Sequence, residues 1–536
     1  MIRKRQIVAV LGLFLVLALL ITACGGGQKA AAPAAKTVFR FPLSAEPPTL
    51  DPAIMVDGVS ITVAQNVFDG LVQFNEKSEV VGAIAKSWDI SPDGKTYTFH
   101  LRDDVTFHNG RKVTAEDFKY SLNRALNPAL KSTVAPLYLG DIVGAKDVIE
   151  GKATEASGIK VIDAKTLQIT IDAPKAYFLA KLTYPTGFVV AKEEVEKGGD
   201  KWTETNLIGT GPFKLKQWVH NSKVILEAND KYFQGRPKVD SIEFSIVTSE
   251  ATQMSMYENG ELDMVYVPAS DIKRVMSDPK LSKELTIVPH ASIQYMALNA
   301  NVFPPFKDVR VRQAFNYAIN KDDLVKVVLQ DAVVKAGGIL PPGMPGYNPD
   351  QKGLPFDVDK AKKLLTEAGY PDGKGFPDLT IYIRAGNATY KKIGEYIQGQ
   401  LLKNLGLKVQ LQEQEWGKFL ADVKKKTVVP AYLLAWGADY MDPQNFLSIL
   451  FRDGSPNNRT GYNNPQVNEL LDKADTTSDP ATRMKLYQQA ENIIVNEVPL
   501  VPLDYGRDNI LMKPYVKGVV NTPMGPLPFH NVQIQK

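Results

Sequence analysis

Apolar and polar residues alternate in the first part of the chain, and this alternation predicts strands. Every second residue is apolar between residues 97 and 101, and again between 167 and 171. This is the period of a strand with one buried face. Ser91-Pro-Asp-Gly94, just before the first run, predicts a turn. Thr114, followed by two acids, predicts the N-cap of a helix, because acids favour the positive first turn.

Later segments show helical spacing mixed with short apolar runs. Val309, Ala314, Phe315, Ala318 and Ile319 form one helical stripe, and Leu364, Leu365 and Ala368 form another that ends near Pro371-Asp-Gly373. Strands are expected at residues 379–383, 407–411 and 432–434. No internal repeat is visible. The pattern predicts an α/β protein of mixed α and β class.

The first 24 residues have a different pattern, which predicts export. A basic head of Arg3, Lys4 and Arg5 precedes an uncharged apolar run from Ile7 to Ile21. That run is short for a spanning helix and is typical of a signal peptide covering residues 1–23. Ile21-Thr-Ala-Cys24 resembles the lipobox of bacterial lipoproteins, which implies cleavage before Cys24 and a diacylglyceryl group on its sulfur. The alternative is an ordinary secretory signal or an uncleaved anchor.

Cys24 is the only cysteine of the 536 residues. A single cysteine forms no intrachain disulfide and supplies no Cys-rich metal site, so lipid attachment is its expected role. Residues 24–36, rich in glycine and alanine, predict a flexible tether. The folded body is expected from Thr37 onward.

Charge and length limit the classes of function. The net charge of +4 becomes +1 once Arg3, Lys4 and Arg5 are removed. This near-neutral balance offers no electrostatic basis for nucleic-acid binding. The length predicts two or three domains, and no second apolar run is long enough to span a bilayer.

Enzyme motifs are absent from the sequence. The five histidines are scattered and form no HExxH motif, and His100 and His108 are expected to be structural or exposed. Gly209-Thr-Gly211 begins like a dinucleotide-binding loop but has Lys214 in place of the third glycine. We therefore predict no catalytic residues, no metal site and no cofactor.

Recognition motifs follow one another along the whole body. They are Asn66–Val72, Ala85–Trp88, Asp93–Arg102, Val105–Gly110, Thr114–Phe118, Gly209–Phe213, Asn229–Tyr232, Gly260–Asp263, Phe306–Phe315, Ala361–Tyr370 and Trp436–Pro443. In this order they resemble the oligopeptide/dipeptide-binding proteins of ABC importers, solute-binding protein family 5. Most motif residues are expected to be turns, caps and core aromatics rather than ligand contacts.

The resemblance implies a two-lobed, periplasmic-binding-protein-like fold with an inserted domain and a hinge. Lobe one would comprise residues 37–60, 185–286 and 504–536, the inserted domain 61–184, and lobe two 287–503. The extended run from Ile287 to Asn299, together with Pro499–Pro502, would cross between the lobes. The implied function is a monomeric, non-enzymatic receptor on the outer side of the cell membrane. It would capture peptides in an interlobe cleft and deliver them to an ABC permease with cytoplasmic ATPases.

The resemblance also implies ligand contacts. In relatives that bind peptides, an aspartate at the position of Asp439 meets the α-ammonium group. Trp436 and Gly437 would line the groove, and Tyr440 completes the motif. Further candidates are Glu46 in lobe one and, in lobe two, Arg384, Asn387 and Tyr390.

One departure from the family pattern leaves open which residue would bind the C-terminal carboxylate of a peptide. Some relatives have an arginine three residues before the tryptophan for the peptide's carboxylate, whereas this chain has Leu433. Arg384 or one of Lys424, Lys425 and Lys426 is a candidate replacement. Other members of the fold carry oligosaccharides, nickel chelates, haem or glutathione, so a receptor for such a solute is the alternative. An extracellular enzyme or structural surface protein is the third hypothesis.

Overall fold

The computed structural model describes residues 36–205 and 207–536. Cys24, the predicted signal peptide and nearly all of the predicted tether lie outside the described residues. One compact unit runs from Val38 to Lys536.

A four-stranded sheet brings the start of this unit beside segments about two hundred residues further along. Its strands, in spatial order, are β1 (Val38–Leu43), β10 (Ser241–Ile246), β9 (Lys223–Ala228) and β8 (Phe213–Val219). β1 and β10 are parallel, and the other pairs are antiparallel. Phe39, Phe213 and Phe244 on this sheet are fully buried. Their rings belong to one hydrophobic core, which holds the sheet to the elements packed against it.

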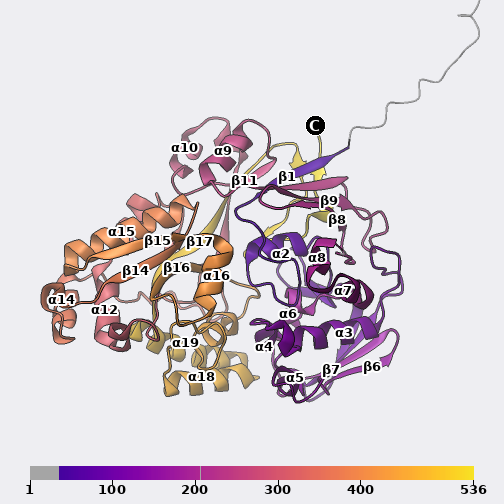
Figure 1. Ribbon diagram of the computed structural model, residues 1–536, viewed down its shortest axis with the longest axis horizontal. Helices are drawn as coiled ribbons and strands as arrows, with labels where there is room; N and C mark the ends of the chain where they lie inside the picture. Colours follow the sequence, from indigo (N-terminus) through magenta and orange to yellow (C-terminus); the bar gives the residue numbers. More distant parts are fainter. Residues whose placement is uncertain (1–35, 206) are drawn as a thin grey trace, which may run out of the picture. The chain divides into compact units, whose positions relative to one another are not determined.

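A second four-stranded sheet confirms the alternation read from the sequence. It consists of β4 (Ala85–Ile90), β5 (Thr96–Leu101), β7 (Thr166–Thr170) and β6 (Ile159–Asp163), all antiparallel. Tyr97, Phe99 and Leu101 are buried, whereas their neighbours are half-buried. The buried face packs against α3 (Ala115–Leu126), which contacts β6 and β7 (Figure 1).

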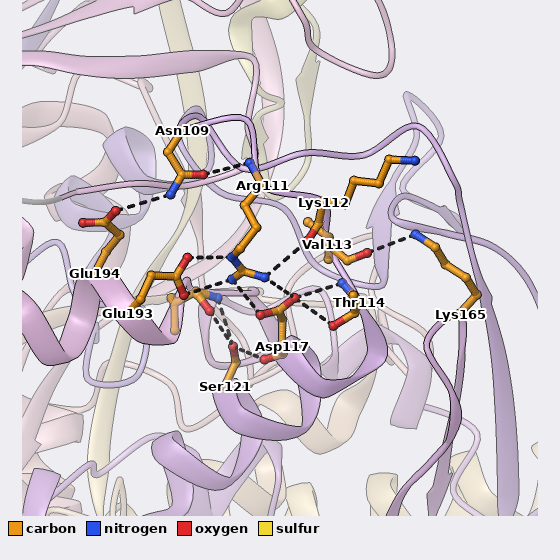
Figure 2. Close-up of polar contacts among 11 residues, drawn as sticks. Asn109, Arg111, Lys112, Val113, Thr114, Asp117, Ser121, Lys165, Glu193 and Glu194 are labelled. Carbon is orange, nitrogen blue, oxygen red and sulfur yellow. Dashed lines mark hydrogen bonds and ion pairs between the residues drawn. The ribbon is translucent and has the colours of Figure 1, made fainter.

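The start of α3 shows what the family-like motif residues do here. The Asp117 carboxylate accepts from the backbone N–H of Thr114 at 2.9 Å and also binds Arg111 through two nitrogens at 2.8 and 3.0 Å. Arg111 reaches across to Glu193 on α7 (Lys192–Gly198), with 2.6 Å between Nε and Oε1 (Figure 2). These residues cap a helix and join two segments, so they are fold markers, as predicted.

The largest sheet contains the strands that matter for the site. Its strands, in spatial order, are β11 (Met264–Tyr266), β17 (Leu500–Met512), β12 (Leu285–Leu298), β16 (Ala431–Gly437), β14 (Leu379–Arg384) and β15 (Val409–Gln414), with β13 (Val334–Lys335) beside β17. The three strands expected from the sequence are present. β15 begins two residues later than predicted.

Helices cover both faces of this sheet. Ala431 and Leu433 pack on one face with α12 (Val309–Ala318), α14 (Val358–Glu367) and α15 (Ala388–Leu405). Tyr432 and Leu434 pack on the other face, whose helices are α16 (Trp416–Lys424), α17 (Leu447–Phe451), α18 (Pro465–Thr476) and α19 (Pro480–Glu497). Because successive residues of a strand point to opposite faces, β16 contributes to both cores.

β12 and β17 are the two long strands of the sheet. They pair antiparallel from Leu285 opposite Leu511 to Ala297 opposite Leu500, with register shifts near Pro289 and Gln294. β12 covers most of the extended run expected between Ile287 and Asn299.

The remaining elements are short. The helices are α2 (Gly58–Ala64), α4 (Ala135–Tyr138), α5 (Ala145–Ile149), α6 (Phe178–Lys181), α8 (Trp202–Thr205), α9 (Glu250–Glu258), α10 (Ile272–Ser277), α11 (Leu281–Glu284) and α13 (Lys321–Asp323). The strands are β2 (Val72–Phe74), β3 (Val80–Gly82), β18 (Val516–Lys517), β19 (Asn521–Thr522), β20 (Gly525–Pro526) and β21 (Gln533–Ile534).

The described residues contain neither a helix suited to cross a membrane nor a cluster of metal-ligating side chains. Within residues 36–205 and 207–536, none of the helices has the length and apolar character needed to cross a bilayer. In the same ranges, no group of three or more His, Cys, Asp or Glu side chains is placed to hold a metal ion.

Candidate ligand-binding site

The segment after β16 is held rigidly by Asn445. The Asn445 side chain accepts from the backbone N–H of Asp439 at 3.0 Å and donates to Asp439 Oδ2 at 3.2 Å. Its backbone oxygen accepts from Trp436 Nε1 at 2.9 Å. Asn445 is fully buried, and Ala438 is tied to β12 through the Ala291 oxygen at 2.8 Å. The predicted residues Trp436, Gly437, Asp439 and Tyr440 therefore lie in one fixed segment.

Only one oxygen of the Asp439 carboxylate accepts hydrogen bonds from the described residues. Oδ2 accepts from the hydroxyl of Tyr138 and from Asn445, whereas Oδ1 accepts nothing from residues 36–205 and 207–536. No cation of the described residues lies within ion-pair distance of Asp439. Burial raises the pKa of Asp439 to about 6, and the hydrogen bonds from Tyr138 and Asn445 oppose that rise. A carboxylate in this state favours a cationic partner that also donates hydrogen bonds.

Tyrosines surround Asp439 from two distant parts of the chain. The rings of Tyr138 and Tyr184 are stacked with centroids 3.7 Å apart. Tyr440 meets Tyr138 edge-on and stacks on Tyr177 at 6.4 Å. Together with Val134, these tyrosines form one buried cluster. Tyr138 and Tyr177 thus pack against the segment that follows β16.

A second contact joins the same two regions. Arg483, on α19, binds the Asp442 carboxylate through two nitrogens at 2.7 Å each. Its guanidinium lies over the ring of Tyr177, 5.1 Å from the centroid. Tyr177 donates to the backbone oxygen of Asp475 at 3.4 Å. Asp442 is therefore committed to a structural ion pair.

The other lobe-two candidates lie where β14 ends and α15 begins. Arg384 stacks over Trp416 at 4.7 Å and donates to the backbone oxygen of Ser44. Asn387 caps α15 by accepting from the Tyr390 N–H at 2.7 Å. Burial raises the pKa of Tyr390 well above its ordinary value, and the Arg384 charge opposes this. These three residues share a neighbourhood, and no hydrogen bond, ion pair or ring contact among the described residues joins them directly to Asp439.

The Glu46 carboxylate is bound by residues of the loop between β8 and β9 and of the end of β8. Its carboxylate accepts from Trp218 Nε1 at 3.0 Å, from the Asn221 N–H at 2.8 Å, and lies 2.7 Å from His220 Nδ1. With three partners, Glu46 has a structural role in this conformation, and its predicted ligand contact stays a prediction.

The three lysines proposed as substitutes for an arginine at position 433 differ from one another. Lys425 pairs with Asp422 at 2.9 Å, and Lys426 donates to the backbone oxygen of Ser455 at 2.9 Å. Lys424 has no carboxylate within ion-pair distance among the described residues. Burial lowers the pKa of Lys424 to about 8, and the charge of Arg459 adds to the decrease.

Residues that could suggest enzyme chemistry serve the fold. His108 Nδ1 accepts from the Gly209 N–H at 3.2 Å, so its Nε2 donates to the Gly211 oxygen at 3.0 Å. Burial lowers the pKa of His108 to about 4, which keeps this tautomer neutral. The prediction of a structural role for His108 is confirmed.

Sequence reasoning missed Tyr138, Tyr184 and Asn445. Asn445 follows Asp442-Pro443, a turn signal that indicates side-chain capping nearby, but nothing identifies Asp439 as its partner. Tyr138 and Asp439 are 301 positions apart, so their contact depends on the tertiary fold.

Comparisons with known proteins place this geometry in a family. The family model described as bacterial extracellular solute-binding proteins, family 5 Middle, matches residues 79–458. The dipeptide-binding protein DppE of Bacillus subtilis is 32% identical over 495 residues, covering 90% of this chain and 89% of DppE.

Solved structures agree. The Escherichia coli murein tripeptide-binding protein MppA superimposes with a TM-score of 0.88 and 30% identity, over 94% of this chain and 99% of that one. A structure described as the unliganded open form of MppA gives a TM-score of 0.65 at 30% identity, over 94% of this chain and 98% of that one. The chain belongs to the bacterial extracellular solute-binding proteins of family 5.

Proposed function

We propose that this protein is an extracytoplasmic receptor that captures peptides and delivers them to an ABC-type importer. The observation that carries the proposal is Asp439, whose half-buried carboxylate has no cation of the described residues beside it and whose Oδ1 accepts no hydrogen bond from them. A peptide's α-ammonium group would supply both the charge and the donors. Charge-assisted hydrogen bonds of this kind contribute about 1.5–3 kcal/mol. The names of DppE and MppA, given for a dipeptide and a murein tripeptide, support the same ligand class.

The architecture of this receptor follows the predicted ranges. Residues 37–60, 185–286 and 504–536 form lobe one, 61–184 the inserted domain, and 287–503 lobe two. β12 and β17 are the hinge strands. Because Tyr138 lies in the inserted domain and Asp439 in lobe two, closure places both at the ammonium site. Trp436 and Gly437 line the groove beside it.

The remaining parts of the proposal concern location and partners. The protein is a monomeric lipoprotein, anchored through Cys24 to the cell membrane and facing the periplasm or the exterior. It has no enzymatic activity, and its partners are permease subunits with cytoplasmic ATPases. The tether of residues 24–36 lets the body reach the permease.

Calorimetric titration of the chain from Cys24 onward tests the ligand class. The protein is first unfolded and refolded to remove carried-over ligand. It is then titrated with di- to pentapeptides, with oligosaccharides and with a nickel chelate. We expect binding of short peptides only. Binding of the oligosaccharide or the chelate, with no peptide bound, would overturn the proposal in favour of the alternative solutes.

A further inference from the structure

Asn445 is a buried amide whose side chain serves the segment after β16. Its exposed fraction is 0%. Oδ1 accepts from the backbone N–H of Asp439 at 3.0 Å, and Nδ2 donates to Asp439 Oδ2 at 3.2 Å. The backbone oxygen of Asn445 accepts from Trp436 Nε1 at 2.9 Å. One residue thus holds the main chain and the carboxylate of Asp439 together with the indole ring of Trp436.

The two contacts with Asp439 fix the direction of its carboxylate. An asparagine side chain has one acceptor oxygen and one donor nitrogen, so only one orientation of the Asn445 amide satisfies both the N–H and the carboxylate of Asp439. Oδ2 is therefore held against Asn445 and the hydroxyl of Tyr138. Oδ1 accepts nothing from residues 36–205 and 207–536, and it is the oxygen left for a ligand.

A series of contacts from α19 supports Asn445 in turn. Asn445 ends the short 3₁₀ helix η7 (Pro443–Asn445), and its N–H donates to the backbone oxygen of Asp442 at 3.0 Å. The Asp442 carboxylate caps this helix by accepting from the Gln444 N–H at 2.9 Å. Arg483 on α19 binds that carboxylate through two nitrogens at 2.7 Å each. This ion pair neutralises Asp442 and fixes the turn from which Asn445 reaches Asp439.

Tyrosines are the titratable groups that face Asp439 from the neighbouring segments. The hydroxyl of Tyr138 donates to Oδ2, the ring of Tyr184 stacks on Tyr138, and Tyr440 meets Tyr138 edge-on. Among residues 36–205 and 207–536, no Lys, Arg or His side chain lies within ion-pair distance of Asp439. An ionised Asp439 therefore depends on two neutral donors, the Tyr138 hydroxyl and the Asn445 amide.

These donors matter because burial disfavours the charged form of Asp439. Burial raises the pKa of Asp439 to about 6, and the hydrogen bonds from Tyr138 and Asn445 oppose the rise. The amide of Asn445 carries no titratable proton, so its donor is present at every pH. Removal of this donor would move the protonation of Asp439 to higher pH.

We propose that Asn445 is a positioning residue that presents Oδ1 of Asp439 to the ligand's ammonium group and sets the lowest pH at which this receptor holds a peptide. The inference rests on the proposed function, because it needs an ammonium group at Asp439. Asn445 does not touch the ligand. It acts through the carboxylate that it orients.

Asn445→Asp tests this role with almost no change in the shape of the side chain. One oxygen still accepts from the Asp439 N–H, whereas the other takes the place of Nδ2, 3.2 Å from Asp439 Oδ2. Two carboxyl groups this close titrate as a pair and share a proton, so full ionisation needs a higher pH. Asn259→Asp is the matched control, because Asn259 is exposed at the end of α9.

Calorimetric titration of the chain from Cys24 onward with Ala-Ala-Ala and its N-acetyl form, between pH 7.5 and pH 5, measures the effect. We expect the affinity of wild type and Asn259→Asp for the free peptide to fall below about pH 6. In Asn445→Asp the fall is expected at least about one pH unit higher, which makes binding at pH 5 about tenfold weaker than in wild type. The N-acetyl peptide has no ammonium group, so its binding should not show this shift.

Thermal melting shows whether each variant is folded. If Asn445→Asp does not fold, Asn445→Ser replaces it, because it removes the donor to Oδ2 without adding a charge. Its shift is expected to have the same sign.

Two results would overturn the inference. A loss of affinity that is equal at every pH would show that Asn445 has a structural role only, and an unchanged pH profile would show that it has no role at Asp439. Failure of the proposed function gives a different result, since wild type would then bind the free and the N-acetylated peptide equally.

Discussion

At Asp439, burial and hydrogen bonding act against each other on one carboxyl group. Burial raises its pKa to about 6, and the two donors on Oδ2 limit the rise. The group is therefore ionised at neutral pH and becomes protonated in mildly acidic solution. Such a group binds an ammonium ion in a pH-dependent manner.

Peptide affinity should fall as the pH falls through about 6. The ionised form binds the ammonium group, so below this pH each further unit weakens binding up to about tenfold, or 1.4 kcal/mol. Calorimetric titration of one tripeptide between pH 7.5 and pH 5 measures this. Asp439→Asn is the matched control, because it keeps the shape of the side chain and has no proton to gain. An equal pH dependence in wild type and variant would exclude Asp439 as its source.

The grouping of residues within the Trp436–Pro443 motif could be predicted from the sequence, because these residues are close together along the chain. Trp436, Gly437, Asp439 and Tyr440 are adjacent in the sequence, so their sharing one segment follows directly. Tyr138 was not predictable, because its hydroxyl reaches Asp439 only when distant segments pack together.

At the scale of elements, two-residue periodicity predicted β5 and β7, and short apolar runs predicted β14, β15 and β16 of the largest sheet. The periodicity worked because one face of a strand is buried and the other is less so. β16 is buried on both faces and therefore appears in the sequence as a continuous apolar run. Such a run does not show the two-residue period of a strand. The pairing of β12 with β17 is a long-range contact that periodicity does not specify.

β17 carries a buried carboxyl group, Asp504, that should affect stability. Asp504 is 1% exposed, its Oδ2 has no partner among the described residues, and burial raises its pKa to about 8. The folded protein therefore holds a proton that the unfolded chain releases above about pH 4. Because the folded state binds more protons, this group makes stability decrease as pH rises from about 4 to about 8.

We expect Asp504→Asn to melt at a higher temperature than wild type at pH 8, with a much smaller difference at pH 5. Thermal unfolding of the ligand-free proteins across this range measures the difference. The other buried acids titrate in both proteins, so the comparison isolates Asp504. Melting curves that shift with pH in parallel would contradict the assignment.

Gly209 and Gly211 show that a glycine motif can be purely structural. A Cβ on Gly209 would lie 1.9 Å from the backbone oxygen of Val67, and one on Gly211 would lie 2.5 Å from the Val67 carbonyl carbon. The close approach of two backbones explains the Gly-Thr-Gly sequence that resembles the start of a dinucleotide-binding loop.

Gly209→Ala should lower the free energy of unfolding by about 2 kcal/mol or more, because backbone atoms have to move to admit the methyl group. Chemical denaturation measures the loss. Gly58→Ala is the control, since a Cβ there meets no atom within 4 Å. Equal stability of the two variants would show that the contact with Val67 relaxes at little cost.

At the scale of the whole molecule, distant segments meet at the proposed binding site. Tyr138 and Tyr184 come from the first half of the chain, whereas Asp439 comes from the last quarter. The tyrosine cluster, and the guanidinium of Arg483 over the ring of Tyr177, hold these segments together.

The central claim is that Asp439 binds the α-ammonium group of a peptide. Its most direct test is the affinity of a free and an N-acetylated tripeptide for wild type and for Asp439→Asn, measured by calorimetry at pH 7.5. We expect acetylation to weaken binding to wild type at least about tenfold, about 1.4 kcal/mol, and to have little effect on the variant. Equal affinity of wild type for the two peptides would contradict the claim.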